Sequence, residues 1–183
     1  MHHFDAKANV ERHIRSIGLN AAFFLPGSYM SNMPRQAILP NPQTGAYTLT
    51  LPIPPTSSMP LIDVVADTGK FVKAMLLNQS TVEGKRILGS VKYYSPEELI
   101  QDFKKVKPVA GTEGGGAAAV QIPDNAFKNF MATTGAPPRI QEELLQNFQL
   151  MADGGFGYYG GESLEFSHSV SLTSFSVTNY HTY

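Results

Sequence analysis

Lys7 is the charged residue with the best claim to chemistry in this sequence. It falls in the first turn of a predicted helix over residues 5–17, where the helix dipole disfavours a positive charge and an acid is the ordinary choice. That placement allows a functional interpretation, in which the ammonium group meets a ligand hydroxyl or phosphate. A solvent-exposed lysine without a role in function is the alternative that the residues alone leave open.

The other candidate motifs lack the context that their chemistry needs. A dinucleotide fingerprint requires a glycine-rich turn between a strand and a helix, so that backbone N–H groups and the helix dipole meet the pyrophosphate. The stretch 112–116 precedes a predicted strand and the stretch 153–161 follows a predicted helix, so we interpret both as flexible loops. The five histidines form no metal-ligand pair and the chain has no cysteine, so the sequence predicts no metal site.

Composition is that of one ordinary globular domain. The 183 residues suffice for a single core, and 42% hydrophobic and 16% charged residues are typical of proteins that work in water. A net charge of −1 gives no electrostatic reason to bind nucleic acid, and no apolar run is long enough to span a bilayer. In the absence of a secretory signal region, we expect a cytoplasmic location, with the nucleus as the alternative.

The helix predicted over residues 5–17 must position Lys7. Val10, Ile14 and Ile17 recur at helical spacing and predict one apolar stripe that packs against the core. Glu11 and the other charged residues of this helix are expected on the outer face. Gly18 then provides a natural C-terminal end.

A buried strand is predicted directly after this helix. Residues 21–25 form a continuous apolar run that ends at Pro26-Gly27, which is typical of a strand buried on both faces in a parallel sheet. A helix followed by a buried strand is half of a βαβ unit. The sequence therefore opens in the middle of an α/β pattern, and we expect the strand before the helix to be missing from it.

The later elements follow from periodicity and capping signals. Ser95-Pro96-Glu97-Glu98 is a strong helix start, because Ser95 and Glu98 form a capping box. From Gly154 onward no period is evident, and no regular element is predicted. The remaining expected elements are strands over 47–53, 86–91 and 117–122, helices over 124–131 and 138–152, and a helix after Asp67 that turns Phe71, Val72, Met75 and Leu76 toward the core.

Several segments together carry a family resemblance. The residues from His3 to Glu11, Ser16-Ile17-Gly18 and the residues from Phe24 to Asn32 resemble the central block of the NmrA-like family, an atypical branch of the short-chain dehydrogenases. The similarity continues in order to about residue 164, and the order and spacing of the segments make it specific. The later segments are 60–64, 67–72, 84–86, 94–98, 120–123 and 157–161.

The resemblance implies an α/β fold, namely the C-terminal half of a partial Rossmann-like, doubly wound parallel sheet plus a small α/β substrate region. We expect one domain over residues 1–183, with the Rossmann part at 1–32 and 60–78 and a substrate or lid region at 33–59 and 79–183. The family's N-terminal strand, glycine-rich loop and helix are not found in this sequence. The resemblance therefore implies an N-terminally truncated member.

The resemblance also implies a cofactor, NADP, and residues that bind it. Lys7 matches the family lysine that holds the nicotinamide ribose. The segment Tyr29, Met30, Ser31 and Asn32 matches the segment that lines the nicotinamide end. No metal is implied.

Function follows from the resemblance less directly. Ordinary short-chain dehydrogenases place a tyrosine acid four residues before the lysine, where this sequence has His3. The NmrA-like branch generally lacks that tyrosine and includes redox sensors and regulators, whereas related isoflavone-reductase-like enzymes use the matching lysine as a general base. The resemblance thus supports an NADP(H)-linked redox sensor or regulator. The alternatives are an NADPH-dependent oxidoreductase of small-molecule secondary metabolism with Lys7 as base or proton relay, and a partner-binding fragment without a cofactor.

The expected partners follow from these hypotheses. They are NADP(H), a small-molecule substrate, and a protein partner or a second copy of the chain. Nucleic acid and membranes are not expected partners, since the net charge is −1 and no membrane-spanning segment is present.

Overall fold

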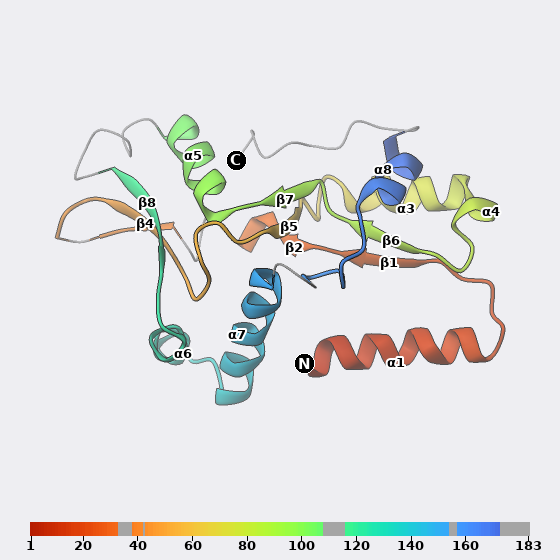
Figure 1. Ribbon diagram of the computed structural model, residues 1–183, viewed down its shortest axis with the longest axis horizontal. Helices are drawn as coiled ribbons and strands as arrows, with labels where there is room; N and C mark the ends of the chain where they lie inside the picture. The colour runs from red at the N-terminus through yellow and green to blue at the C-terminus, as the bar shows by residue number, and fades with distance from the viewer. Residues whose placement is uncertain (33–37, 42, 108–115, 154–156, 173–183) are drawn as a thin grey trace.

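The fold is described from a computed structural model, which places residues 1–32, 38–41, 43–107, 116–153 and 157–172. The predicted loop at 112–116 lies outside these residues except for Gly116, and residues 154–156 of the second glycine-rich stretch lie outside them as well. Figure 1 shows an elongated molecule in which short strands run along the long axis, with helices on both sides.

Helices and strands are interspersed along the chain, as in a mixed α/β pattern. The strands are β1 (Phe23–Pro26), β2 (Ser28–Tyr29), β3 (Ile38–Pro40), β4 (Tyr47–Leu51), β5 (Met59–Ile62), β6 (Arg86–Gly89), β7 (Lys92–Tyr94) and β8 (Ala117–Gln121). The helices are α1 (His2–Ser16), the 3-10 turn η1 (Met30–Asn32), α3 (Thr68–Leu77), α4 (Gln79–Val82), α5 (Pro96–Val106), α6 (Asp124–Thr133), α7 (Pro138–Ala152) and α8 (Glu165–Leu172).

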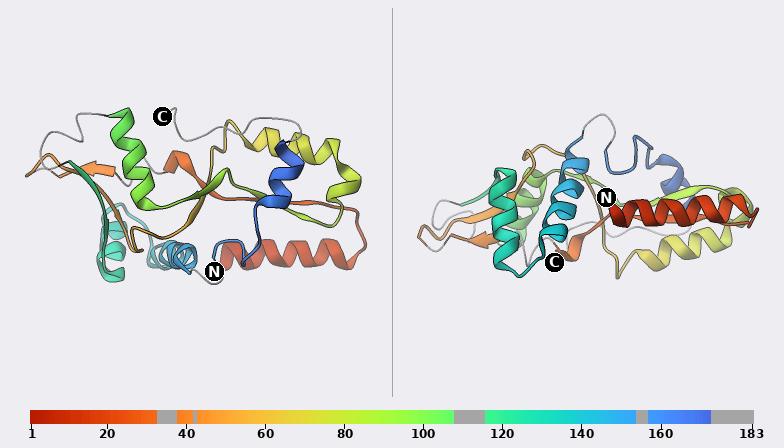
Figure 2. Two further views of the ribbon diagram at one scale, coloured as in Figure 1. Left: turned by 45° about the horizontal axis from the view of Figure 1, so that its top comes forward. Right: turned by 90° about the horizontal axis from the view of Figure 1, so that it is seen from below.

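The strands form three small sheets, in which parallel pairs dominate. β1 pairs in parallel with β6, and β2 pairs in parallel with β5, whose other edge takes β7 antiparallel. The third sheet has the order β3-β4-β8, with β4 and β8 parallel. Around the β1–β6 pair, α1 lies on one side and α3 and α8 lie on the other (Figures 1 and 2). This layering confirms the predicted α/β class.

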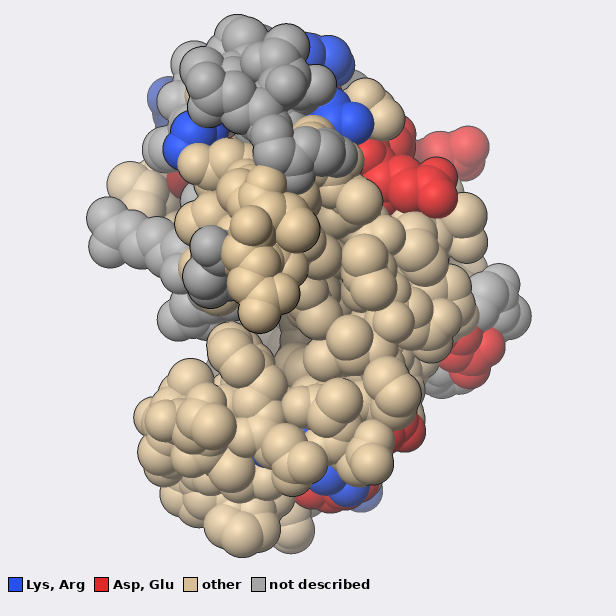
Figure 3. Space-filling view, turned by 90° about the vertical axis from the view of Figure 1, so that its left-hand side faces the viewer, with Lys and Arg blue, Asp and Glu red and all other residues tan. Residues whose placement is uncertain are grey.

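Apolar burial is divided between two clusters. One gathers around β4, β5, β7 and α5, with Leu49, Leu61 and Leu99 at its centre. The other lies between β6 and α3, where Ile87 and Phe71 are buried. Seen end-on from the side of β3, β4 and α6, the molecule shows mainly uncharged side chains across its middle, with charged ones at its top, its right-hand edge and its base (Figure 3).

The predicted helix start at Ser95 is confirmed in detail. The Glu98 N–H donates to the Ser95 hydroxyl at 3.1 Å, and the Ser95 N–H donates to the Glu98 carboxylate at 2.8 Å. The hydrogen bond from the Ser95 backbone lowers the pKa of Glu98, because it favours the charged carboxylate. The sequence could predict this helix start because Ser95 and Glu98, which form the capping box, lie only three residues apart.

The predicted inner face of α1 is wrong at Val10 and Ile17, whereas Ile14 is half-buried. No residue of α1 is buried, and the side chains of Val10 and Ile17 are 59% and 60% exposed. Glu11 turns inward instead: its side chain is 12% exposed and lies 3.0 Å from the Arg86 guanidinium of β6. Ionic and aromatic contacts, rather than the apolar stripe, set the rotation of this helix.

Two further expectations are corrected on the opposite side of the sheet. α3 buries Phe71 and Ala74, whereas Val72 and Leu76, predicted to face the core, are 40% and 63% exposed. The tail predicted to be irregular contains α8, although residues 173–183 lie outside the described part. α8 covers the outer edge of β6, where the Leu88 N–H donates to the Ser167 hydroxyl at 2.7 Å.

The passage from β1 into β2 depends on a close backbone approach at Gly27. A Cβ atom at this position would lie 2.6 Å from the carbonyl oxygen of Pro60 and 3.1 Å from the hydroxyl of Tyr159. The first contact is with backbone, which cannot rotate away, so only glycine fits without a shift of β5. The junction thereby sets where Tyr29 and the residues after it stand.

Substituting Gly27 therefore tests the junction. We expect Gly27→Ala to lower the free energy of unfolding by about 1–3 kcal/mol, because overpacking forces backbone to move. Gly69→Ala is the matched control, since open space surrounds that position in α3 and alanine favours the helix by up to about 1 kcal/mol. Urea unfolding followed by circular dichroism measures both, and equal stabilities of the two variants would contradict this account.

Candidate functional site

The candidate site lies where the first turns of α1 meet the end of β1. α1 brings His3, Phe4 and Lys7 to this place, and the chain after Gly27 brings Tyr29. Because His3 and Phe4 precede Lys7 by four and three residues, the three side chains lie on neighbouring parts of one helix face.

His3 ties the start of α1 to α7. Its ring Nδ1 lies 2.6 Å from a carboxylate oxygen of Glu143, and its backbone N–H donates to the same oxygen at 2.9 Å. These hydrogen bonds, the ring contact first, lower the pKa of Glu143, because they favour the charged carboxylate. His3, four residues before Lys7, thus has a structural partner.

An aromatic cluster lies beside the contact of His3 with Glu143. The ring of Phe4 meets that of Tyr158 edge-on at 5.4 Å, and Tyr158 meets Tyr159 at 5.2 Å in the same geometry. Tyr93 extends the cluster, with its ring 6.5 Å from that of Tyr159. Edge-to-face contacts of this kind stabilise beyond the area that they bury.

The phenols of the cluster are held in the neutral form. Burial raises the pKa of Tyr158, and the nearby Tyr29 raises it further. Burial also raises the pKa of Tyr159, whose hydroxyl donates to the Leu25 carbonyl at 3.2 Å. A phenol with a raised pKa is a poor proton donor and no base at neutral pH. These tyrosines therefore serve packing and hydrogen bonding here.

Lys7 is exposed on the helix face next to the cluster. None of the ion pairs found among the described residues includes it, whereas Glu11, one turn further along α1, is paired with Arg15 and Arg86. The Lys7 ammonium group is thus an available cation on α1, one helical turn after Phe4. Such a group can donate hydrogen bonds to hydroxyl or phosphate oxygens.

The segment after β2 divides into exposed and buried residues. Tyr29 is 40% exposed, and Ser31 and Asn32 are also exposed. Met30 is 3% exposed and belongs to the apolar core around β4 and β5. The hydroxyls of Tyr29 and Ser31 and the amide of Asn32 are therefore the groups of this segment that a ligand can reach.

Sequence reasoning did not assign a role to Tyr93, Glu143, Tyr158 or Tyr159. Glu143 lies 140 residues from its partner His3, and nothing in the local pattern of α7 distinguishes it from neighbouring acids. The glycine-rich stretch around Tyr158 and Tyr159 was noted only as a loop and as part of the resemblance. The glycines of this stretch are the feature that could have indicated the cluster. Glycines allow sharp turns, and a sharp turn can bring two neighbouring tyrosine rings together.

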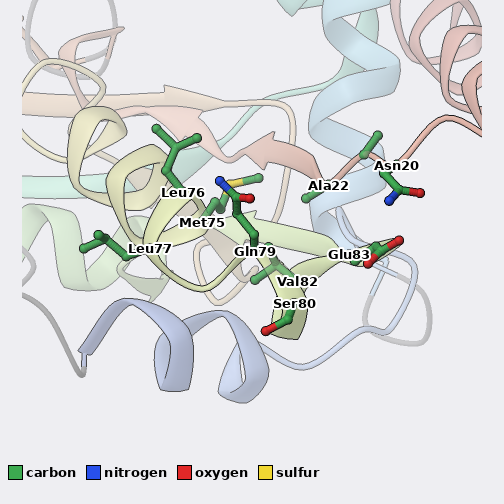
Figure 4. A pocket seen from close by; sticks show the side chains of 10 residues that line it. Asn20, Ala22, Met75, Leu76, Leu77, Gln79, Ser80, Val82 and Glu83 are labelled. Carbon is green, nitrogen blue, oxygen red and sulfur yellow. The ribbon is translucent and has the colours of Figure 1, made fainter.

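Two open hollows of the described surface lie away from Lys7. The larger is an open groove of about 750 Å3 between the start of β1 and the helices α3 and α4, lined in part by Ala22, Met75 and Leu76 (Figure 4). It lies at the opposite end of α1 from Lys7. Within the described residues, no group of acidic and histidine side chains is arranged to hold a metal ion, and no helix is long and apolar enough to cross a membrane.

Comparison with protein families gives a match over the whole chain. A model of the NmrA-like family matches residues 1–183. No curated protein matches the chain.

Solved structures share the fold at low sequence identity. The negative transcriptional regulator NmrA in complex with NADP is 18% identical with a TM-score of 0.65, and the match covers 88% of this chain and 51% of that one. The triphenylmethane reductase of Citrobacter sp. complexed with NADP(H) is 14% identical with a TM-score of 0.62, covering 93% and 54%. A nucleoside-diphosphate-sugar epimerase of Staphylococcus aureus is 16% identical with a TM-score of 0.64, covering 96% and 55%.

These matches show a Rossmann-like α/β fold. The chain spans about half the length of the solved structures that it matches.

The contact of His3 with Glu143 gives a prediction about α1. Because the folded-state pKa of Glu143 is lowered, its contribution to stability is full above the ordinary glutamate pKa and is lost as the pH falls through the lowered value. We expect Glu143→Gln to speed hydrogen exchange of the first turns of α1 at pH 7, and the difference from the unsubstituted chain to vanish in acid.

Glu142→Gln is the matched control for this measurement. Glu142 neighbours Glu143 on α7 but pairs with Lys128 of α6. Faster exchange of α1 in Glu142→Gln, or unchanged exchange in Glu143→Gln, would show that the His3 contact does not hold the helix.

Proposed function

The chain belongs to the NmrA-like family, and from this premise we propose that it is an NADP(H)-linked redox sensor or regulator. In this proposal Lys7 and the segment Tyr29 to Asn32 receive the nicotinamide end of the dinucleotide. The regulator NmrA, whose fold this chain shares, has been crystallised with NAD and with NADP.

One observation favours dinucleotide binding without catalysis. His3, which stands four residues before Lys7, is engaged by Glu143 at 2.6 Å. The neighbouring phenols of Tyr158 and Tyr159 have raised pKa values because they are buried. Proton transfer is efficient when the pKa of the acid lies near the working pH, and raised tyrosine values lie far from it. A site with an available cation and poor acids suits a bound dinucleotide better than its turnover.

The described residues fit one end of the proposed ligand. A ribose offers hydroxyl groups and a nicotinamide offers an amide, which the Lys7 ammonium, the Tyr29 hydroxyl and the Asn32 amide can meet with hydrogen bonds. A pyrophosphate requires a glycine-rich turn that opens a helix, and the described residues contain no such turn. We therefore assign this chain the nicotinamide-facing part of the site.

A second function is favoured by the chemistry of Lys7 itself. Lys7 is exposed and makes no ion pair among the described residues, so it is free to act as base or proton relay in an NADPH-dependent oxidoreductase of small-molecule metabolism. The triphenylmethane reductase, a structural neighbour, binds NADP(H). A chain that binds a protein partner and no cofactor is the third candidate.

Calorimetry with NADP+ and NADPH tests the proposal on the chain as it stands. We expect measurable binding that Lys7→Ala weakens by roughly 10- to 100-fold, because a hydrogen bond from a charged donor contributes about 1.5–3 kcal/mol. Lys85→Ala, which removes an exposed lysine just before β6, should bind as the unsubstituted chain does.

Three other outcomes decide against the proposal. No binding of either nucleotide would favour the partner-binding candidate. Binding that Lys7→Ala leaves intact would place the nucleotide elsewhere. NADPH consumption with a panel of carbonyl compounds, abolished by Lys7→Ala, would establish the oxidoreductase instead of the regulator.

A further inference from the structure

Phe4 and Tyr158 are two rings of the candidate site to which the proposed function assigns no role. Phe4 lies on α1 three residues before Lys7, and Tyr158 lies in the turn 157–161. Their ring centroids are 5.4 Å apart and the ring planes cross at 77°. Both residues are half-buried, so part of each remains at the surface of the described chain.

Further contacts fix the orientation of the two rings. Tyr158 also meets the ring of Tyr159 at 5.2 Å and 84°, and Tyr159 is 7% exposed. The ring of His3 lies 4.5 Å from that of Phe4, and His3 is held in turn by Glu143 of α7. Figures 1 and 2 show the start of α1 beside α7. Rings that are already fixed in place lose little freedom when a ligand packs on them, which favours binding.

Lys7 and Tyr29 lie next to this pair of rings. Phe4 precedes Lys7 by three residues, so the two side chains are neighbours on the surface of α1. Burial raises the pKa of Tyr158, and Tyr29, which is 40% exposed, raises it further because like charges on two nearby phenols repel each other. The rings of Phe4 and Tyr158 therefore adjoin both groups that the proposed function assigns to the nicotinamide end of the dinucleotide.

Two rings that cross at a steep angle form a corner that suits a third planar ring. A planar ring laid against the face of one of them meets the other edge-on. Both arrangements are favourable, because the face of an aromatic ring is negative and its edge is positive. A ribose or a phosphate has no π face and gains no such contact. The corner between Phe4 and Tyr158 therefore favours a ligand group that is flat and aromatic.

We propose that Phe4 and Tyr158 form the surface against which the planar nicotinamide ring of the dinucleotide packs. The inference rests on the proposed function, in which Lys7 meets the ribose that carries this ring. Because the ring is bonded directly to that ribose, it must lie close to Lys7, and Phe4 is one turn back on the same helix. Lys7 then holds the sugar by hydrogen bonds, and the two aromatic side chains hold the ring by packing.

Two probes that differ in the ring test this assignment. Nicotinamide mononucleotide carries the ribose, its phosphate and the nicotinamide ring, whereas ribose 5-phosphate has no ring. In titrations followed by NMR, we expect Phe4→Leu and Tyr158→Leu to weaken binding of the first probe roughly fivefold to fiftyfold, because stacking on an aromatic side chain contributes on this scale. Binding of the second probe should not change. Lys7→Ala should weaken binding of both probes, since both contain the ribose.

Matched variants separate the aromatic ring from other features of these residues. Tyr158→Phe keeps the ring and removes only the hydroxyl, so it should bind both probes as the unsubstituted chain does. Phe130→Leu, at a 45% exposed position of α6, removes a ring elsewhere and should also leave both affinities unchanged. In the unsubstituted chain, nuclear Overhauser contacts should join the nicotinamide ring protons to the rings of Phe4 and Tyr158.

Equal weakening of both probes by the leucine substitutions, or no weakening of either, would overturn the inference, since the rings would then only support the fold. Overhauser contacts of the nicotinamide protons with other side chains alone would also overturn it. That measurement uses the unsubstituted chain, so it decides the question even where a leucine variant does not fold. By contrast, binding of neither probe, or binding that Lys7→Ala leaves intact, would contradict the proposed function itself.

Discussion

The approach of the Gly27 backbone to the Pro60 carbonyl is the constraint on which the site depends. It lets β1 pass from its pairing with β6 into β2 and its pairing with β5 without a side chain between the strands. The Tyr159 hydroxyl closes the same corner by its hydrogen bond to the Leu25 carbonyl. The passage from β1 into β2, and with it the place of Tyr29, thus depends on a contact that only a glycine allows without a shift of β5.

α1 is attached to this framework by specific contacts rather than by a buried apolar face. His3 bonds to Glu143, Phe4 packs on Tyr158, and Glu11 pairs with Arg86. Each contact fixes the rotation of the helix as well as its place. As a consequence, Lys7 follows Phe4 by one turn on a helix whose rotation is fixed, and Val10 and Ile17 are left exposed to water.

The titratable side chains next to the first turns of α1 are poor proton donors. Burial keeps the phenols of Tyr158 and Tyr159 protonated, and His3 is committed to a carboxylate. What remains accessible is the Lys7 ammonium and the polar groups of Tyr29, Ser31 and Asn32, which can form hydrogen bonds. A regulator and a reductase among the solved structures share this fold.

The sequence by itself determined the features whose partners lie close along the chain. The capping box of Ser95 and Glu98, the apolar run of β1 and the family of the chain were all readable from the residues and their order. Only the tertiary structure decided which face of α1 turns inward, that α8 forms over β6, and that Tyr158 meets Phe4. The physical reason is that periodicity reports the spacing of apolar residues along an element, whereas the choice of face is made by contacts such as Glu11 with Arg86, between residues far apart in the chain.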